Sequence, residues 1–265
     1  MCLILFAYKA HPRYAFVLAA NRDERYDRPT LAAGFWSDHP RVYGGRDLEC
    51  GGTWLGVARS GRFAAITNFR DGYAQKTAAR SRGTLVAEFL CGVKSAAAYI
   101  DEIAQSAAHF NGFNLLVGDL DSTHYLSNRG HRAAAIEAGI HGLSNHLLDT
   151  PWPKVARGKE TLARLLATDE NTMTAGLFDL LADRLIAPDH VLPDTGVGLH
   201  RERVLSPAFI VSPGYGTRSS TVALICNDGE VLFAERSFGP HGAPGGEVTE
   251  RYSIDTAASI ARLRE

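Results

Sequence analysis

The pattern of hydrophobic and polar positions predicts strands at the beginning, in the middle and near the end of this chain. Nearly continuous apolar runs at residues 3–8 and 14–20 are typical of strands covered on both faces. A hairpin is predicted at residues 53–58 and 63–68, around a turn that contains Gly61. The other predicted strands are residues 113–118, 124–127, 140–143, 207–211, 219–226 and 231–237.

Helical periodicity appears between these groups of strands. The predicted helices are residues 83–90, 96–107, 151–166, 174–186 and a short terminal helix at 257–263. Residues 29–52, 188–198 and 239–246 are predicted to be mostly loop. Groups of strands alternate with groups of helices, so the order favours an α+β protein, specifically a layered αββα sandwich, over a parallel βαβ fold. No linker divides the chain, and residues 1–265 are predicted to form a single domain.

Composition narrows the classes of function. Of 265 residues, 45% are hydrophobic and 22% charged, and the formal net charge is −1, which gives no electrostatic case for nucleic acid or an anionic membrane. No apolar run approaches the roughly 18 residues of a membrane span, and the start lacks the basic region of a signal peptide. No two of the four cysteines form a C-x-x-C pair, so we expect neither a zinc site nor a disulfide framework. This use of cysteine predicts a cytoplasmic location.

Cys2 is the first candidate for chemistry, because it follows the initiator Met1 directly. Removal of Met before a small residue would place a thiol and a free α-amine on Cys2. The α-amine titrates near pH 8 and can act as a general base for the thiol nucleophile. The alternative is that Cys2 is only a small buried hydrophobic residue.

Further polar residues lie where predicted apolar strands begin or end, so a layered sheet could bring them together around Cys2. These residues are Arg22, Asp23, Asn68, Asn145 and Arg218. The set suits acyl transfer: a thiolate attacks an amide carbonyl, asparagine amides hold the oxyanion, and Arg and Asp lower the thiol pKa and orient the amine. Two alternatives stay open. Residues 21–25 could form a solvated turn, and strand-end Asn and Arg side chains often only satisfy backbone groups.

Several familiar motifs are missing from the sequence. It contains no Walker sequence, no strand-borne G-x-G-x-x-G, no H-E-x-x-H and no G-x-S-x-G. The ten histidines are scattered, and the spacing of His141 and His146 would not place both on one helix face. We therefore predict no metal site, although a haem-binding histidine stays open without the C-x-x-C-H of covalent attachment.

Seven motifs occur in an order that resembles one protein family. They are Met1-Cys2-Leu3-Ile4, Ala20-Asn21-Arg22-Asp23-Glu24, Gly51-Gly52-Thr53-Trp54-Leu55-Gly56, Thr67-Asn68-Phe69-Arg70, Leu143-Ser144-Asn145, Asp149-Thr150-Pro151-Trp152-Pro153-Lys154 and Gly214-Tyr215-Gly216-Thr217-Arg218-Ser219-Ser220-Thr221. The chain is similar to the NRDE family, also called the transport and Golgi organisation protein 2 family. The likeness extends to about Phe238.

That family resembles, more distantly, N-terminal-nucleophile hydrolases of the penicillin V acylase and bile salt hydrolase type. The resemblance implies a four-layer αββα sandwich with an N-terminal catalytic cysteine. It also implies that Cys2, Arg22, Asn68, Asn145 and Arg218 follow the order of those enzymes' site residues. One departure is that the hydrolases separate their Arg and Asp by two residues, whereas Arg22 and Asp23 are adjacent. Adjacent strand residues point to opposite faces unless the strand bulges or ends there.

Two functions are carried forward. The first is a cysteine amidohydrolase that cleaves a small acyl amide at Cys2 and requires no cofactor. The alternative is a non-catalytic carrier or chaperone for haem, or for a lipid. This follows from the family's association with secretory organisation, lipid metabolism and intracellular haem trafficking, since fold does not fix function. A pure protein-interaction module would leave the strand-end polar cluster unexplained.

Overall fold

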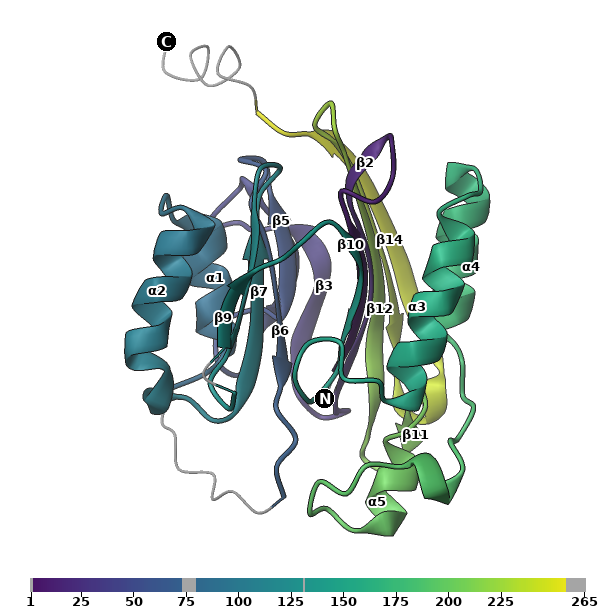
Figure 1. The fold of residues 1–265 in the computed structure, drawn as a ribbon. Coiled ribbons are helices and arrows are strands. Elements are labelled where there is room, and N and C mark those ends of the chain that lie inside the picture. Colours follow the sequence, from purple (N-terminus) through teal and green to yellow (C-terminus); the bar gives the residue numbers. More distant parts are fainter. Residues whose placement is uncertain (1, 73–79, 131, 256–265) are drawn as a thin grey trace.

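Two seven-stranded antiparallel sheets pack face to face, and helices cover the outer face of each (Figure 1). This architecture comes from a computed structural model that describes residues 2–72, 80–130 and 132–255. The layer order is helix, sheet, sheet, helix. The predicted αββα sandwich is therefore confirmed, while the assignment of residues 1–265 to one domain stays a prediction.

The first sheet contains the strands that carry most of the predicted site. Its order is β10 (Gly139–Leu143), β1 (Cys2–Tyr8), β2 (Tyr14–Arg25), β12 (Tyr215–Cys226), β13 (Glu230–Phe238) and β14 (Pro244–Ser253), with β11 (Val211–Ser212) paired to β12. The second sheet follows the chain more simply. Its order is β3 (Thr30–Phe35), β4 (Val42–Asp47), β5 (Leu55–Ala58), β6 (Phe63–Asn68), β7 (Phe113–Gly118), β8 (Thr123–Ser127) and β9 (Arg132–Ala135).

The strand alternation of β1 explains its continuous apolar run. Ile4 and Phe6 face the second sheet, whereas Leu3 and Leu5 face the helices, and all four are buried. Successive side chains of a strand point to opposite faces, and here both faces are covered by protein. Complete burial of one such side chain contributes about 1.5–3 kcal/mol to folding. The same parity fixes which face each polar residue near Cys2 must take.

Two pairs of helices form the outer layers. Helices α1 (Gly83–Cys91) and α2 (Ala96–Ser106) cover the second sheet, and α3 (Pro153–Leu165) and α4 (Glu170–Leu181) cover the first (Figure 1). Each presents an apolar stripe, represented by the fully buried Leu85 of α1 and Leu162 of α3. The short helix α5 (Leu199–Val204) lies at the end of the sandwich near β11 (Figure 1).

The structure differs from the predicted elements where strands carry polar side chains. Strand β2 continues through residues 21–25 instead of ending at residue 20, because its backbone stays paired with β1 and β12. The predicted loops at 29–52 and 239–246 contain β3, β4 and the start of β14, and β9 and α5 were not predicted. Of the predicted strand 207–211, only residue 211 is in a strand. The predicted helix at 257–263 lies outside the described residues.

Candidate functional site

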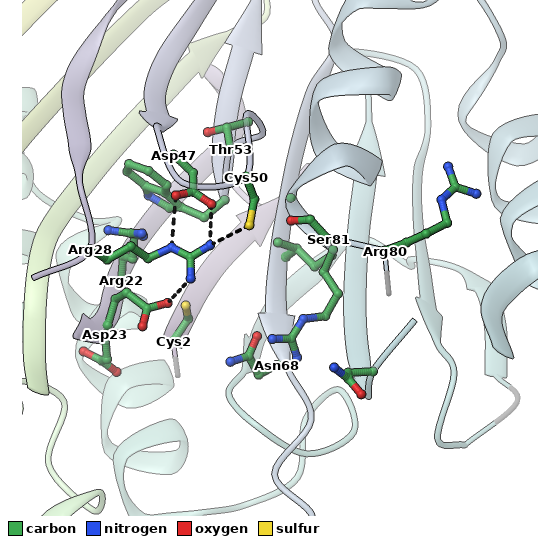
Figure 2. A pocket seen from close by; sticks show the side chains of 16 residues that line it. Cys2, Arg22, Asp23, Arg28, Asp47, Cys50, Thr53, Asn68, Arg80 and Ser81 are labelled. Atoms are coloured by element: carbon green, nitrogen blue, oxygen red, sulfur yellow. Dashed lines mark hydrogen bonds and ion pairs between the residues drawn. The ribbon is translucent and has the colours of Figure 1, made fainter. Parts of the chain in front are cut away.

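A pocket of about 310 Å³ opens between the two sheets at the end of the sandwich where β1 begins. Its walls come from β1 and β2 of one sheet, from β4 and β6 of the other, and from the segment that leads into α1 (Figure 2). Its lining residues are Cys2, Arg22, Asp23, Glu24, Arg28, Asp47, Cys50, Thr53, Trp54, Ile66, Asn68, Arg80, Ser81, Arg82, Gly83 and Asn111. Pockets that bind small molecules fall in this range of volume.

Cys2 is the first residue of β1 and lies directly opposite Arg22 in the pairing of β1 with β2. Burial raises the pKa of its thiol. The Asp23 carboxylate raises this pKa further, whereas the Asp23 backbone N–H and the Arg22 charge lower it. Of the two residues expected to lower the thiol pKa, Arg22 does so, whereas Asp23 acts in both directions, through its charge and through its backbone N–H. A thiol whose pKa is raised forms little thiolate unless a base takes its proton.

Arg22 reaches from the first sheet toward the second. Its guanidinium lies 4.2 Å from the centroid of the Trp54 ring, and its Nη1 donates to Thr30 Oγ1 at 3.2 Å. The residue is only 6% exposed, and burial lowers its pKa. The stack on Trp54 fixes the plane of the guanidinium, so its remaining N–H groups have a defined direction.

Asp23 occupies the opposite face of β2. Its Oδ1 accepts a hydrogen bond from Thr217 Oγ1 at 2.7 Å, and burial raises the pKa of its carboxyl. The register shift lies in β12 instead, between Thr217 and Ser219, so β2 remains a regular strand here. Because β2 neither ends nor bulges at this point, the predicted separation of Arg22 and Asp23 onto opposite faces holds. Both residues still line the pocket.

The two predicted asparagines have different positions. Asn68, at the end of β6, lines the pocket and lies across it from Arg22 (Figure 2). Asn145 is completely buried outside the lining, and its Nδ2 donates to the backbone oxygen of Asn68 at 2.9 Å. Its Oδ1 accepts from Ser144 Oγ at 3.3 Å. Asn145 therefore holds the backbone that presents Asn68.

Arg218 also lies outside the pocket lining. Its Nη1 donates to the backbone oxygens of Arg25 at 2.8 Å and Arg28 at 3.1 Å. These bonds secure the chain where it leaves β2. The structure thus brings Cys2, Arg22, Asp23 and Asn68 into one pocket, and it places Asn145 and Arg218 in its support.

Three arginines that line the pocket were not predicted: Arg28, Arg82 and the exposed Arg80. Arg28 binds Asp47 through two bonds, of 2.6 and 3.0 Å, and this pairing raises the pKa of Arg28. Arg82 precedes α1, is half-buried, and donates from Nη1 to the backbone oxygen of Gly112 at 2.9 Å. None of the three belongs to one of the recognised motifs, and all stand in segments that carry no hydrophobic period.

A second buried polar group lies behind Asp23. The Nζ of Lys154 donates to the backbone oxygens of Leu205 at 3.0 Å and Pro207 at 3.4 Å. Burial lowers the pKa of Lys154 to about 8, and the charge of Asp23 acts in the opposite direction. Arg70 Nη1 lies 2.6 Å from Glu202 Oε2 in an almost fully buried ion pair. Lys154 and Arg70 belong to recognised motifs, so the motifs could have indicated that these two residues lie near the site.

Metal and membrane features are absent from the part of the chain that the structure describes. No group of three His, Cys, Asp or Glu side chains there is arranged to hold a metal ion. Within the same residues, no helix combines the length and the apolar character that crossing a bilayer requires.

Fold and site together define an αββα sandwich whose first strand presents a cysteine to a polar pocket between the sheets. The chain belongs to the Transport and Golgi organisation 2 family, whose model matches residues 1–240. It is 37% identical over 257 residues to the Transport and Golgi organization protein 2 homolog of Bos taurus, with 89% of this chain and 93% of the relative covered. It is 29% identical to Transport and Golgi organization protein 2 of Drosophila melanogaster, with 91% and 95% covered.

Solved structures with a similar course of the chain include a conjugated bile acid hydrolase from Clostridium perfringens. The TM-score is 0.44 at 10% identity, with 96% of this chain and 92% of that chain covered. A Caenorhabditis elegans N-acylethanolamine-hydrolyzing acid amidase ortholog also has a TM-score of 0.44, at 11% identity, with 83% and 92% covered.

Proposed function

We propose that this protein is a cysteine amidohydrolase that cleaves a small acyl amide with Cys2 as the nucleophile. The observation that carries the proposal is the shared pocket of Cys2, Arg22 and Asn68, which combines a thiol, a fixed cation and a side-chain amide. Acyl transfer needs a nucleophile and donors for the developing oxyanion within one site.

The proposed reaction has two steps. The Cys2 thiol gives its proton to a base as its sulfur bonds to the amide carbon, and the carbonyl oxygen takes up negative charge. The amide C–N bond then breaks, and the amine leaves with that proton, so that a thioester remains. Water hydrolyses the thioester to a carboxylic acid and restores the thiol. In this scheme the Asn68 amide donates to the oxyanion, and Arg22 stabilises the thiolate.

The base in this scheme is the α-amine of Cys2, which exists only after Met1 has been removed. The raised pKa of the thiol supports the need for such a base, because little thiolate forms without one. Asn145 and Arg218 contribute as positioning residues, through Asn68 and through the end of β2 respectively.

Intact mass measurement combined with turnover tests this proposal. The active chain is expected to lack Met1, and Cys2→Ala is expected to abolish release of amine from N-octanoyl amides. Cys91→Ala is the matched control, because Cys91 is an exposed thiol at the end of α1, outside the pocket. Full turnover by a chain that retains Met1 would exclude the α-amine mechanism.

A haem carrier is the second candidate. It is favoured by two thiols, Cys2 and Cys50, that line one pocket, because a cysteine thiolate can serve as an axial ligand of haem iron. Haem titration should then shift the Soret band of the wild-type protein more than that of an albumin control. The Cys2→Ala, Cys50→Ala double variant should lose this shift. An unchanged Soret band in the wild type removes this candidate.

A further inference from the structure

The arginines that line the pocket differ in whether a carboxylate pairs with them directly. Arg28 is bonded to Asp47 as described, and its Nη1 also lies 3.8 Å from Glu24 Oε2 and 3.3 Å from Glu49 Oε1. Asp47, Glu24 and Glu49 therefore surround Arg28, and Glu49 also pairs with Arg25 at 2.8 Å. Asp23 is directed to the other face of β2, toward Thr217.

Arg22 and Arg82 lack such carboxylate partners. Among residues 2–72, 80–130 and 132–255, no Asp or Glu oxygen lies within 4.0 Å of either guanidinium. Residues 73–79, which precede this wall in sequence, contain no Asp or Glu. Burial lowers the pKa of both arginines, which reflects the cost of keeping a cation there. The charge of Glu24 opposes this shift in both arginines, and that of Asp47 opposes it in Arg22, but neither carboxylate lies within 4.0 Å of them.

The remaining N–H groups of these two arginines are not buried away from solvent. Within the part of the chain that the structure describes, each guanidinium makes one hydrogen bond, from Arg22 to Thr30 and from Arg82 to Gly112. Within the described residues, no nitrogen of Arg22 or Arg82 is a buried atom that lacks a partner. A guanidinium has five N–H groups in a planar fork that fits an oxyanion. Both side chains also line the same cavity as Cys2.

Arg80 provides a contrast on the same wall. It is exposed, lies 3.6 Å from Glu88 and stacks at 5.0 Å on the ring of Phe110. Figure 2 shows its guanidinium directed away from Cys2. Among the described arginines that line the pocket, Arg22 and Arg82 are thus the two without a direct ion pair.

We infer that Arg22 and Arg82 form an anion subsite beside Cys2, and that the ligand is an acyl amide carrying a carboxylate next to the amide, as in an N-acyl amino acid. The inference rests on the proposed function for the amide, but the subsite itself is a statement about binding. A charge-assisted hydrogen bond contributes about 1.5–3 kcal/mol. Replacing the carboxylate by a neutral amide is therefore expected to weaken binding about tenfold or more.

Calorimetric binding to the Cys2→Ala protein tests the subsite without turnover. The ligands are N-octanoylglycine, its neutral analogue N-octanoylglycinamide, and N-octanoylaminomethylphosphonate, which asks whether a phosphonate serves as well as a carboxylate. The glycine ligand is expected to bind at least about tenfold more tightly than the glycinamide. Equal binding of these two, or no binding of any of the three, overturns the inference, as does stronger binding of the phosphonate than of the carboxylate.

Variants then identify the residues. In the same background, Arg82→Gln is expected to abolish the preference for charge, whereas Arg82→Lys retains most of it. Arg46→Gln is the control: Arg46 also stacks on a tryptophan, at 4.1 Å from the centroid of Trp36, but lies outside the pocket lining. Thermal unfolding checks that each variant is folded. An Arg82→Gln protein that is folded and keeps the full preference overturns the assignment.

Turnover separates this inference from the proposed function. If the protein with native Cys2 binds N-octanoylglycine selectively but never cleaves it, the hydrolase proposal fails and the anion subsite stands. If the protein cleaves both octanoyl amides with equal kcat/KM, the hydrolase proposal stands and the subsite fails.

Discussion

At the scale of single residues, the site depends on side chains that serve other side chains. Asn145 never reaches the pocket, yet its amide holds the backbone of Asn68. Asp149 has a similar role where β10 leads toward α3. It has a positive φ of 58° and accepts hydrogen bonds from Gly142 N at 2.9 Å, Lys159 Nζ at 2.6 Å and His141 Nδ1 at 2.8 Å. Asn145 and Asp149 thus each hold a backbone segment in place, at Asn68 and at Gly142 respectively.

The pKa of Asp149 yields a prediction of pH dependence. Its hydrogen bonds lower the pKa from 3.8 to about 2, against the effect of burial, which raises it. A group with a lowered pKa in the folded state stabilises the protein above its unfolded pKa, and this contribution is lost as the pH falls through about 2. Because Asp149 is one-third exposed, we expect Asp149→Asn to lower the free energy of unfolding by only about 1 kcal/mol at pH 7.

Urea unfolding of both proteins between pH 2 and pH 7 measures this effect. The difference between wild type and Asp149→Asn should shrink below pH 4 and largely vanish near pH 2. Lys159→Met, which removes one partner, should lower the stability by a smaller amount at pH 7. A difference between wild type and Asp149→Asn that is independent of pH would contradict the assignment.

At the scale of secondary-structure elements, close backbone contacts set the walls of the pocket. A Cβ atom on Gly52 would lie 2.4 Å from the carbonyl carbon of Gly83 and 2.8 Å from the backbone nitrogen of Thr84. The loop before β5 therefore packs directly on the first turn of α1, and only glycine permits this. Arg82 immediately precedes that turn, so the contact also positions one side of the anion subsite.

We expect Gly52→Ala to destabilise the protein by about 1–3 kcal/mol, because neither backbone can yield without moving the start of α1. Thermal unfolding gives the stability, and amide hydrogen exchange of α1 should be faster in the variant. Gly34→Ala in β3 is the matched control, since no described atom lies within 4 Å of its Cβ position and alanine is the better strand residue. Equal stability of the two variants would exclude a backbone contact at Gly52.

The elements also show how far the sequence could lead. Apolar periodicity predicted β1, the β5–β6 hairpin and α3 because burial dictates those positions. It did not predict that β2 continues through residues 21–25, because the partners that hold those polar residues come from β1 and β12. Arg82 was not predicted as a site residue for the same reason, because its role depends on a fold that brings the start of α1 beside β1 and β2. Sequence order could propose Cys2, Arg22 and Asn68 as neighbours, but it could not reveal which charges lacked a partner.

At the scale of the whole molecule, the two sheets and α5 meet in one buried network beneath the pocket. Arg70, just after β6, donates its backbone N–H to Asn145 O at 2.7 Å, and its guanidinium stacks at 4.7 Å on the ring of Trp152. The same guanidinium pairs with Glu202 of α5. Glu202 in turn accepts hydrogen bonds from Thr195 N at 2.9 Å and Oγ1 at 2.5 Å. The ends of β6, β10 and α5 are thereby held together.

This buried pair should be strongly coupled. Arg70→Met removes the cation and leaves the Glu202 carboxylate buried without its main counter-charge, which typically costs about 3–5 kcal/mol. Glu202→Gln is expected to cost less, since the amide still accepts from Thr195 while Arg70 keeps its place on Trp152. In the double variant no charge is left uncompensated at this position. Its loss of stability should therefore be smaller than the sum of the single losses by about 1–3 kcal/mol.

A double-mutant cycle by urea unfolding measures this coupling. Arg203→Met and Asp189→Asn provide the comparison, because that pair, at 2.5 Å, is about half exposed on both sides and should couple by less than about 1 kcal/mol. If the Arg70 and Glu202 losses simply add, the ion pair is not what joins α5 to the strand ends. A large coupling would show that the Arg70–Glu202 pair joins α5 to the end of β6. A change at α5 would then reach Asn68 through Arg70 and Asn145.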